Sequence, residues 1–393
     1  MATHLAAVFV AEGQPFELQT RPTPKPGPDE LLVAVKTIAL NPADIQIRGK
    51  GLFISKYPTV IGFEMSGLVL EVGDNVPTGT SGNDGTQSFQ PGTRVVAYSG
   101  SFWKSWGPDY GTFQERCLVP WQHAVRLPGE GISWNHAATL PVAIEVPLNA
   151  WDVMGIPRVG ESSPRGLVSA GSTGTNADGN EIKQISKMEK KEALLIWGAS
   201  SSVGTMGVQT ARLLREDPDS SFAAVYATAG SANKSYVESL GADRVFDYKD
   251  PQVVDAIVSA AKEDELVIKH CFLANGELAL CQAVLKAFVG KNEEESMETT
   301  VAKIGSAPVV PLDAEVISGI ETMFVLPSMV EKERLKQFQY WIGKCLGENL
   351  VKGAIKPSPE PTLIGKGLEA INAGLDRLIQ GVSCTKLIVE VAE

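Results

Sequence analysis

Two kinds of hydrophobic pattern divide the chain. Up to about residue 140, apolar and β-branched residues form short runs of strand length, and clusters of Gly, Pro, Asn and Asp that favour turns separate them. The clearest runs are residues 6–10, 30–35, 67–72 and 93–98. This first pattern predicts a small, irregular, barrel-like domain that is rich in β-structure.

The second pattern begins at Ala193, where apolar strands alternate with helices. The strands are expected at 193–197, 223–227, 244–246 and 266–268, and the helices between them at 203–216 and 234–240. Alternation of this kind predicts a parallel sheet with helices on both faces. The end of the chain adds a helical pattern at 363–380 and a last strand at 386–391. The fold class is therefore α/β, a Rossmann doubly wound parallel sheet beside a β-rich domain.

Two polar stretches interrupt these patterns. Residues 77–89 are rich in Gly, Ser and Thr, and so are residues 158–192. Such compositions bury little apolar surface, so we expect a mobile loop and a flexible surface insertion. A short hairpin is the alternative for 158–192.

Composition narrows the function classes. The 393 residues are 44% hydrophobic and carry a net charge of −11, which argues against nucleic acid or an anionic membrane as partner. No apolar run approaches the ~20 residues that a bilayer span needs, and no signal peptide is evident, so we expect a cytoplasmic protein without membrane contact. The five cysteines are scattered and form no C-x-x-C pair, which predicts reduced thiols and no zinc ribbon.

A phosphate-binding loop is predicted where the first strand of the second half ends. Strand 193–197 runs directly into a small-residue loop that opens a helix, the position where backbone amides and the helix dipole attract a pyrophosphate. Small side chains let the backbone approach the ligand closely. A glycine turn that only packs helix against strand is the alternative. The candidate cofactor residues here are Gly198, Ser200, Ser201, Ser202, Val203 and Gly204.

The residues after the second strand favour NADP(H) over NAD(H). NAD-binding proteins place an acid there to hold the 2′-hydroxyl of the ribose. This chain has Thr-Ala-Gly-Ser at 228–231 and no acid. Ser231, Lys234 and Tyr248 could together donate to a 2′-phosphate. The alternative is a solvated lysine and a half-buried tyrosine.

Several motifs now resemble one family, the medium-chain dehydrogenase/reductases, which combine a GroES-like catalytic domain with a Rossmann domain. The matching stretches are 41–44 (NPAD), 58–67 (PTVIGFEMSG), 91–95 (PGTRV), 111–115 (GTFQE), 137–141 (AATLP), the loop at 198–204, 241–243 (GAD) and 386–389 (KLIV). The resemblance implies a GroES-like domain over 1–145 and 333–393. It implies a Rossmann domain over 146–332, with 158–192 as its insertion.

Departures from the family's zinc enzymes indicate the branch. Those enzymes carry a metal-binding Cys where this chain has Asn41 and a His where it has Phe63, and no cysteine stands near 142–144. Three protein ligands are needed for a catalytic zinc, so no metal is expected. The chain resembles the zinc-free quinone oxidoreductases and enoyl reductases, especially fungal members that include trans-acting enoyl reductases of polyketide pathways.

The resemblance also implies site residues. Asn41 is the candidate polar donor for a substrate carbonyl, unless the Asn-Pro turn only shapes its loop. Tyr57 is a possible proton donor, although a tyrosine before proline is more often a packing residue. Thr139 either contacts the nicotinamide side of the cleft or begins a helix. Phe272, Phe324 and Lys386 are implied contacts of the cofactor.

Two further features of the first domain are a glutamate near the expected site and a group of aromatic residues. Glu64 is expected to hold its loop in place. Trp103, Trp106 and Tyr110 alternate with glycines and suggest an aromatic lid, but we favour surface packing for them.

Three functions stay open at this point. The first is an NADPH-dependent reductase that transfers hydride to a small apolar conjugated enoyl, enone or quinone. The second is a trans-acting enoyl reductase that needs a carrier protein or polyketide synthase as partner. The third is a non-catalytic NADPH-binding protein of the crystallin-like kind. Either a monomer or a homodimer fits the family.

Overall fold

The computed structural model describes residues 2–79, 87–129, 131–160, 174–175, 181–182, 191–289 and 301–391. The chain divides into two compact units. The first unit contains Met1–Val146, Ser201–Met206 and Leu326–Glu393, and the second contains Pro147–Ser200 and Gly207–Val325. The domain boundaries expected from the sequence, at 145/146 and 332/333, stay a prediction.

The first unit is built around one long strand. Strand β3 (Glu30–Ala39) pairs with three neighbours, β4, β6 and β17, in antiparallel fashion. The seven-stranded sheet has the order β16-β17-β3-β4-β5-β7, and β6 pairs β3 off this path. Its other strands are β4 (Glu64–Val72), β5 (Arg94–Tyr98), β6 (Arg116–Pro120), β7 (Ala124–Arg126), β16 (Pro361–Lys366) and β17 (Lys386–Glu390), and β1 (Thr3–Val8) pairs β2 (Glu17–Pro22) separately.

Residues far apart in sequence close the core of this unit. Apolar side chains of β1, β3, β4 and β5 pack with those of the C-terminal helix α10 and strand β17. Among them, the rings of Phe9, Phe16 and Phe113 meet at centroid distances of 5.4 and 5.5 Å. The helices that lie wholly in this unit are α1 (Pro42–Lys50), α2 (Trp134–Ala138), α8 (Glu331–Phe338), α9 (Gly347–Val351) and α10 (Ala370–Ile379), with a π-helical stretch at Gln339–Leu346.

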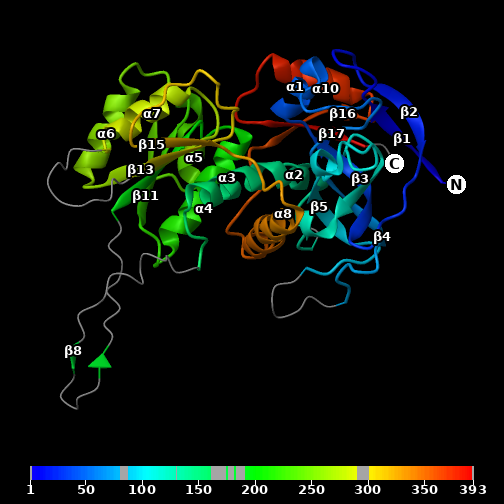
Figure 1. Ribbon diagram of the computed structural model, residues 1–393, viewed down its shortest axis with the longest axis horizontal. Coiled ribbons are helices and arrows are strands. Elements are labelled where there is room, and N and C mark those ends of the chain that lie inside the picture. The colour runs from blue at the N-terminus through cyan, green and yellow to red at the C-terminus, as the bar shows by residue number, and fades with distance from the viewer. Residues whose placement is uncertain are drawn as a thin grey trace. The chain divides into compact units, whose positions relative to one another are not determined.

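The second unit holds a six-stranded sheet in which every neighbouring pair is parallel. Its order is β12-β11-β10-β13-β14-β15. Numbered from β10 as the first strand, this is the 3-2-1-4-5-6 order of the Rossmann fold, which confirms the predicted fold class. Figure 1 labels β11, β13 and β15 of this sheet. The strands are β10 (Glu192–Trp197), β11 (Phe222–Thr228), β12 (Arg244–Phe246), β13 (Val267–Leu273), β14 (Ala302–Ser306) and β15 (Ile320–Phe324).

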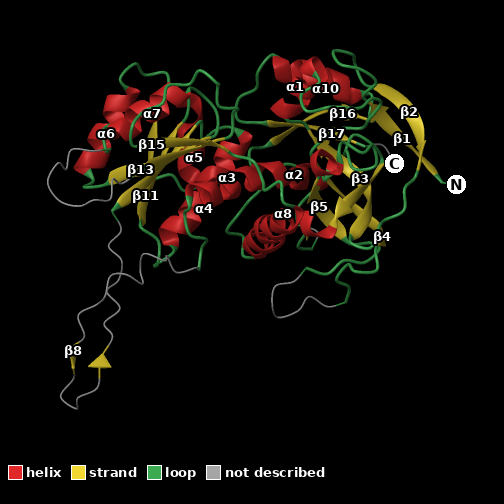
Figure 2. Cartoon of the chain, in the orientation of Figure 1, coloured by secondary structure: helices red, strands yellow, loops and turns green. Residues whose placement is uncertain are grey.

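Helices cover both faces of this sheet because its strands are apolar on both sides. Ala193, Leu195 and Trp197 of β10 belong to a core shared with α6 and α7, which are the red helices beside β13 in Figure 2. On the other face, the ring of Phe272 packs against Trp151 of α3 at a centroid distance of 5.6 Å. The helices are α3 (Pro141–Met154), α4 (Ser202–Glu216), α5 (Lys234–Ser239), α6 (Val253–Glu263) and α7 (Leu278–Lys286).

The predicted insertion at 158–192 lies largely outside the described residues. Within it, β8 (Gly174–Thr175) and β9 (Glu181–Ile182) pair antiparallel. Whether 158–192 is a flexible insertion stays a prediction. The loop expected at 77–89 lies outside the described residues over 80–86. None of the helices in the described part of the chain has both the length and the apolar character needed to cross a bilayer.

Candidate active site

The loop that follows β10 has the geometry of a dinucleotide-binding turn. Gly198 adopts a φ of +79°, and a Cβ there would clash with the backbone of Asn275. A side chain is therefore excluded on two grounds, the left-handed backbone and the lack of space. The Gly198 amide donates to Thr228 Oγ1 at the end of the neighbouring strand β11, at 2.9 Å.

The start of helix α4 supplies groups for a phosphate. Ser201 Oγ accepts a hydrogen bond from the Gly204 amide at 3.1 Å and so shapes the first turn. Ser202 Oγ is buried and has no hydrogen-bond partner among the described residues. An unsatisfied buried hydroxyl at a helix N-terminus fits a phosphate oxygen, which accepts hydrogen bonds and is attracted by the helix dipole. The residues present therefore fit a dinucleotide.

The residues predicted for the 2′-phosphate follow the carboxyl ends of neighbouring strands. The backbones of β11 and β12 are joined where they end, by the Ala229 amide donating to the Phe246 carbonyl at 2.9 Å. Ser231 begins a 3₁₀ turn after β11, and Lys234 begins α5. Tyr248 is 44% exposed and its ring lies beside Gly230. The structure thus brings Tyr248 next to the loop that carries the other two.

The two phenylalanines implied by the family differ in position. Phe324 ends the edge strand β15 and is 37% exposed, so it is free to meet a ligand. Phe272 is fully buried between the sheet and the helices α3 and α4, with its ring close to Trp151 and Gly207. Phe272 thus packs in the core beside the sheet, and its expected role toward the cofactor stays a prediction.

A buried polar network in the first unit surrounds Asn41. Lys386 Nζ lies 2.6 Å from Asn41 Oδ1 and 2.6 Å from Glu64 Oε1. The Asn41 amide nitrogen donates to Glu64 Oε1 at 3.0 Å and to the Ala39 carbonyl at 3.3 Å. Both amide hydrogens of Asn41 are thus used inside the protein. The network joins the ends of β3, β4 and β17.

Two further groups complete the network. Glu64 Oε2 accepts from the Val142 amide at 2.8 Å, and Glu64 thereby holds the start of α3 against β4. Asp44 Oδ2 accepts a hydrogen bond from the backbone N–H of Asn41 at 2.8 Å. Asp44 Oδ1 is buried without a hydrogen-bond partner among the described residues. Burial raises the pKa of Asp44 to about 8, which the Asn41 backbone hydrogen bond and the Lys386 charge only partly oppose.

The other candidate catalytic residues lie elsewhere in the first unit. Tyr57 is half-buried, and its ring packs edge-on against Phe9 at 5.2 Å. Burial, reinforced by the charge of Glu12, raises the pKa of Tyr57. Thr139 is fully buried and donates to the His136 carbonyl at 2.8 Å, at the end of helix α2 rather than at the beginning of a helix.

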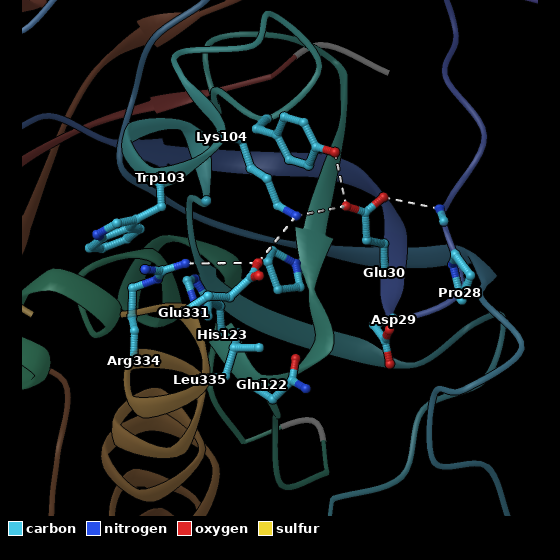
Figure 3. Close-up of a pocket in the computed structure, with 14 residues that line it drawn as sticks. Pro28, Asp29, Glu30, Trp103, Lys104, Gln122, His123, Glu331, Arg334 and Leu335 are labelled. Carbon is cyan, nitrogen blue, oxygen red and sulfur yellow. Dashed lines mark hydrogen bonds and ion pairs between the residues drawn. The ribbon is translucent and has the colours of Figure 1, made fainter. Parts of the chain in front are cut away.

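The aromatic residues predicted as lid or surface packing have separate roles. Trp106 is buried in the core of the first unit. Trp103 and Tyr110 line a pocket of about 500 Å³ that also contains residues of α8 (Figure 3). Sequence reasoning missed this pocket and the pairing of Lys386 with Glu64, since both join segments that are far apart along the chain.

Comparison with known proteins identifies the family. The profile of the alcohol dehydrogenase GroES-like domain matches residues 27–129. The chain is 34% identical to a protein of Aspergillus flavipes named trans-enoyl reductase tndF, over 98% of both chains. It is 35% identical to trans-enoyl reductase tazE of Aspergillus terreus, over 85% of this chain and 96% of that one. The chain belongs to the enoyl reductase branch of the medium-chain dehydrogenase/reductases.

Solved structures agree on the fold. An alcohol dehydrogenase superfamily protein from Novosphingobium aromaticivorans superposes with a TM-score of 0.69 at 19% identity, and the match covers 99% of this chain and 100% of that one. As a medium-chain dehydrogenase/reductase, the chain is an oxidoreductase that uses a nicotinamide dinucleotide. That the loop at 198–204 holds this dinucleotide stays a prediction.

Proposed function

We propose that this enoyl reductase is zinc-independent, uses NADPH, and reduces the conjugated C=C–C=O group of an enoyl chain carried by a polyketide synthase. The similarity to two fungal trans-enoyl reductases over nearly their whole lengths carries this proposal. When bound, the reduced nicotinamide supplies the hydride. The protein must hold the pyrophosphate, position the enoyl group, exclude water and provide a proton.

The network around Asn41 supports zinc independence. Lys386 places a cation 2.6 Å from the Asn41 oxygen, the atom that would have to face a metal. A Zn²⁺ ion at the same oxygen would be repelled by the ammonium group and would gain only an amide ligand in place of a thiolate. These residues do not fit a catalytic zinc, so no step is assigned to one.

The same network defines what Asn41 does in this reaction. Because both of its amide hydrogens are used by Glu64 and Ala39, we assign Asn41 as a positioning residue that fixes the loop between β3 and α1. Tyr57 is the proposed proton source, since a tyrosine hydroxyl carries a proton at neutral pH and can donate it.

Lys234 is expected to determine the preference for NADPH. In the wild-type enzyme, kcat/KM should be at least about 10-fold higher with NADPH than with NADH. The Lys234→Ala variant should raise KM for NADPH by about 10-fold, because a charge-assisted hydrogen bond contributes roughly 1.5–3 kcal/mol, and leave KM for NADH unchanged. Lys262→Ala, at an exposed lysine in the last turn of α6, is the matched control. Equal losses with both cofactors would contradict a 2′-phosphate contact.

Dependence on a carrier protein is tested by presenting the same acyl group either on free pantetheine or on an acyl carrier protein. The rate of NADPH oxidation is measured with crotonyl-pantetheine and with the crotonyl group on the phosphopantetheine arm of an isolated acyl carrier protein. A carrier-bound substrate should give a kcat/KM at least about 10-fold higher, because docking of the carrier adds binding energy remote from the reacting atoms. Equal turnover of both would indicate a reductase of free substrates. Cofactor binding without turnover of either would contradict the proposed reaction.

A further inference from the structure

A second pocket in the first unit is separate from the Asn41 network and shares no residue with it. It has a volume of about 500 Å³, within the size range of small-molecule sites. The residues that line it come from the start of β3, the 100–110 segment, the end of β6 with the turn after it, and helix α8 (Figure 3). Nothing in the proposed reductase reaction uses it.

Two cationic side chains of this pocket, Lys104 and Arg334, form long ion pairs with the same carboxylate, Glu331. Lys104 Nζ lies 3.7 Å from Glu331 Oε1, and Arg334 Nη2 lies 3.9 Å from the same oxygen. Figure 3 shows the two side chains approaching Glu331 from different sides. Neither distance is that of a hydrogen bond. The Glu331 side chain is 64% exposed, so a competing carboxylate could take its place at small cost.

The other acids of the pocket are already satisfied. Glu30 Oε1 accepts from the Tyr110 hydroxyl at 2.9 Å, and Glu30 Oε2 accepts from the Gly27 amide at 3.0 Å. Asp29 Oδ2 accepts from the Asn75 side chain at 3.3 Å. The remaining ion pair of Lys104, with Glu30, is 4.0 Å long. The two cations of the pocket are therefore less closely paired than its carboxylates, although the acidic residues outnumber the basic ones.

Two buried donors of the lining residues, Trp103 Nε1 and Arg334 Nε, have no hydrogen-bond partner among the described residues, and one buried acceptor, Gln122 Oε1, has none either. Arg334 is almost fully buried, and its guanidinium lies over the Trp103 ring at 4.9 Å. Burial lowers the pKa of Arg334, and the charge of Glu331 opposes this only in part. A buried cation with incomplete pairing favours an added anion.

His123 adds a neutral wall. Its ring stacks on the Phe338 ring at a centroid distance of 3.9 Å. Within the described chain, neither ring nitrogen has a hydrogen bond of acceptable geometry. The Tyr98 backbone nevertheless lies near enough to affect the pKa of His123. Burial, with the nearby Arg334 charge, lowers the pKa of His123 to about 3, so the ring is uncharged at neutral pH. Most of the remaining lining is aromatic or apolar, from Trp103 and Tyr110 to two prolines and a leucine, and Gln122 adds a polar amide.

We propose that this pocket binds a small organic carboxylate with a planar, apolar body, whose carboxylate replaces that of Glu331 between Lys104 and Arg334. The cations and the unpaired donors recognise the charge, and the aromatic and proline surfaces accept the body of the ligand. Glu331 then acts as an internal competitor that leaves when the ligand enters.

The test is calorimetric titration of the full chain with benzoate, in the presence of saturating NADP⁺. Benzoate should bind with one site per chain, and the uncharged isostere benzamide should bind at least about 10-fold more weakly. Glu331→Gln should tighten benzoate binding about 3-fold or more, because the internal competitor loses its charge. Arg334→Met should weaken it at least about 10-fold, the loss expected for a charge-assisted hydrogen bond.

Because Arg334 also donates to the Ser328 and Met329 carbonyls, its variant could fail to fold. Lys104→Met is the second test, since the Lys104 side chain is 35% exposed, and it should weaken benzoate binding by a similar factor. Lys352→Met, at an exposed lysine of the C-terminal part, is the control that should leave binding unchanged. Equal affinity for benzamide, no binding of benzoate, or an unchanged affinity in the Lys104 and Glu331 variants would each overturn the proposal.

Discussion

Replacing Lys386 with Met should destabilise the first unit by about 3–5 kcal/mol, the cost of breaking a buried ion pair from one side. The Glu64 side chain is fully buried and the Lys386 side chain is 5% exposed, so removing the ammonium leaves an uncompensated carboxylate in the core. Urea unfolding followed by tryptophan fluorescence measures the effect. Five of the seven tryptophans lie in the first unit, so most of this signal reports on it: Trp103, Trp106, Trp121, Trp134 and Trp341.

A double variant separates charge from packing. Lys386→Met combined with Glu64→Gln removes both charges, while the glutamine oxygen can still accept from the Val142 amide. Most of the lost stability should return. Lys366→Met is the matched control, because the Lys366–Glu390 pair is 74% exposed on the lysine side and should contribute less than about 1 kcal/mol. A loss below about 1 kcal/mol in the Lys386 variant would show that the buried pair does not hold these strands together.

The class of fold could be predicted because its signals are local. Strand 193–197, the small-residue loop and the helix that follows are adjacent in sequence, so hydrophobic periodicity and turn chemistry identify them. The parallel order of the sheet then follows from strand–helix alternation. The predicted phosphate loop likewise depends on residues within one turn of each other, such as Gly198 and Ser202.

The polar networks could not be predicted in this way. Lys386 meets Glu64 only because β17 pairs with β3 and β3 pairs with β4. Strand–helix alternation predicts that strands run parallel but not that β17 lies beside β3, so only the family resemblance relates the lysine to the cofactor. The structure gives it two partners in the first unit, and a role toward the cofactor stays a prediction.

Burial of individual aromatic residues is equally hard to predict from spacing. Trp103 and Trp106 stand three residues apart in one Gly-rich segment. One lines a pocket and the other packs in the core. The same holds for the strand residue Phe272, since residues along a strand alternate between faces, but only the tertiary packing decides what covers each face.

The buried carboxyl group of Asp44 should make stability fall as pH rises from about 4 to 8. In the folded protein its pKa is about 8, whereas an unfolded chain releases this proton near pH 4. Between these values folding takes up one proton, so the stabilisation that is complete below pH 4 is lost progressively up to pH 8. One proton over two pH units corresponds to about 2.7 kcal/mol between pH 5 and pH 7.

The Asp44→Asn variant isolates this contribution. Its side-chain oxygen can still accept from the Asn41 backbone amide, but it has no charge to titrate. Urea unfolding at pH 5, 6 and 7 should therefore show a stability difference between wild type and variant that grows by about 2.7 kcal/mol in favour of the variant. Asp376→Asn is the control, because that exposed carboxylate pairs with Arg48 at the surface and should not change the slope over this range. Parallel pH curves for the wild type and the Asp44 variant would mean that Asp44 is ionised in the folded protein, and that the Asn41 hydrogen bond and the Lys386 charge outweigh the effect of burial.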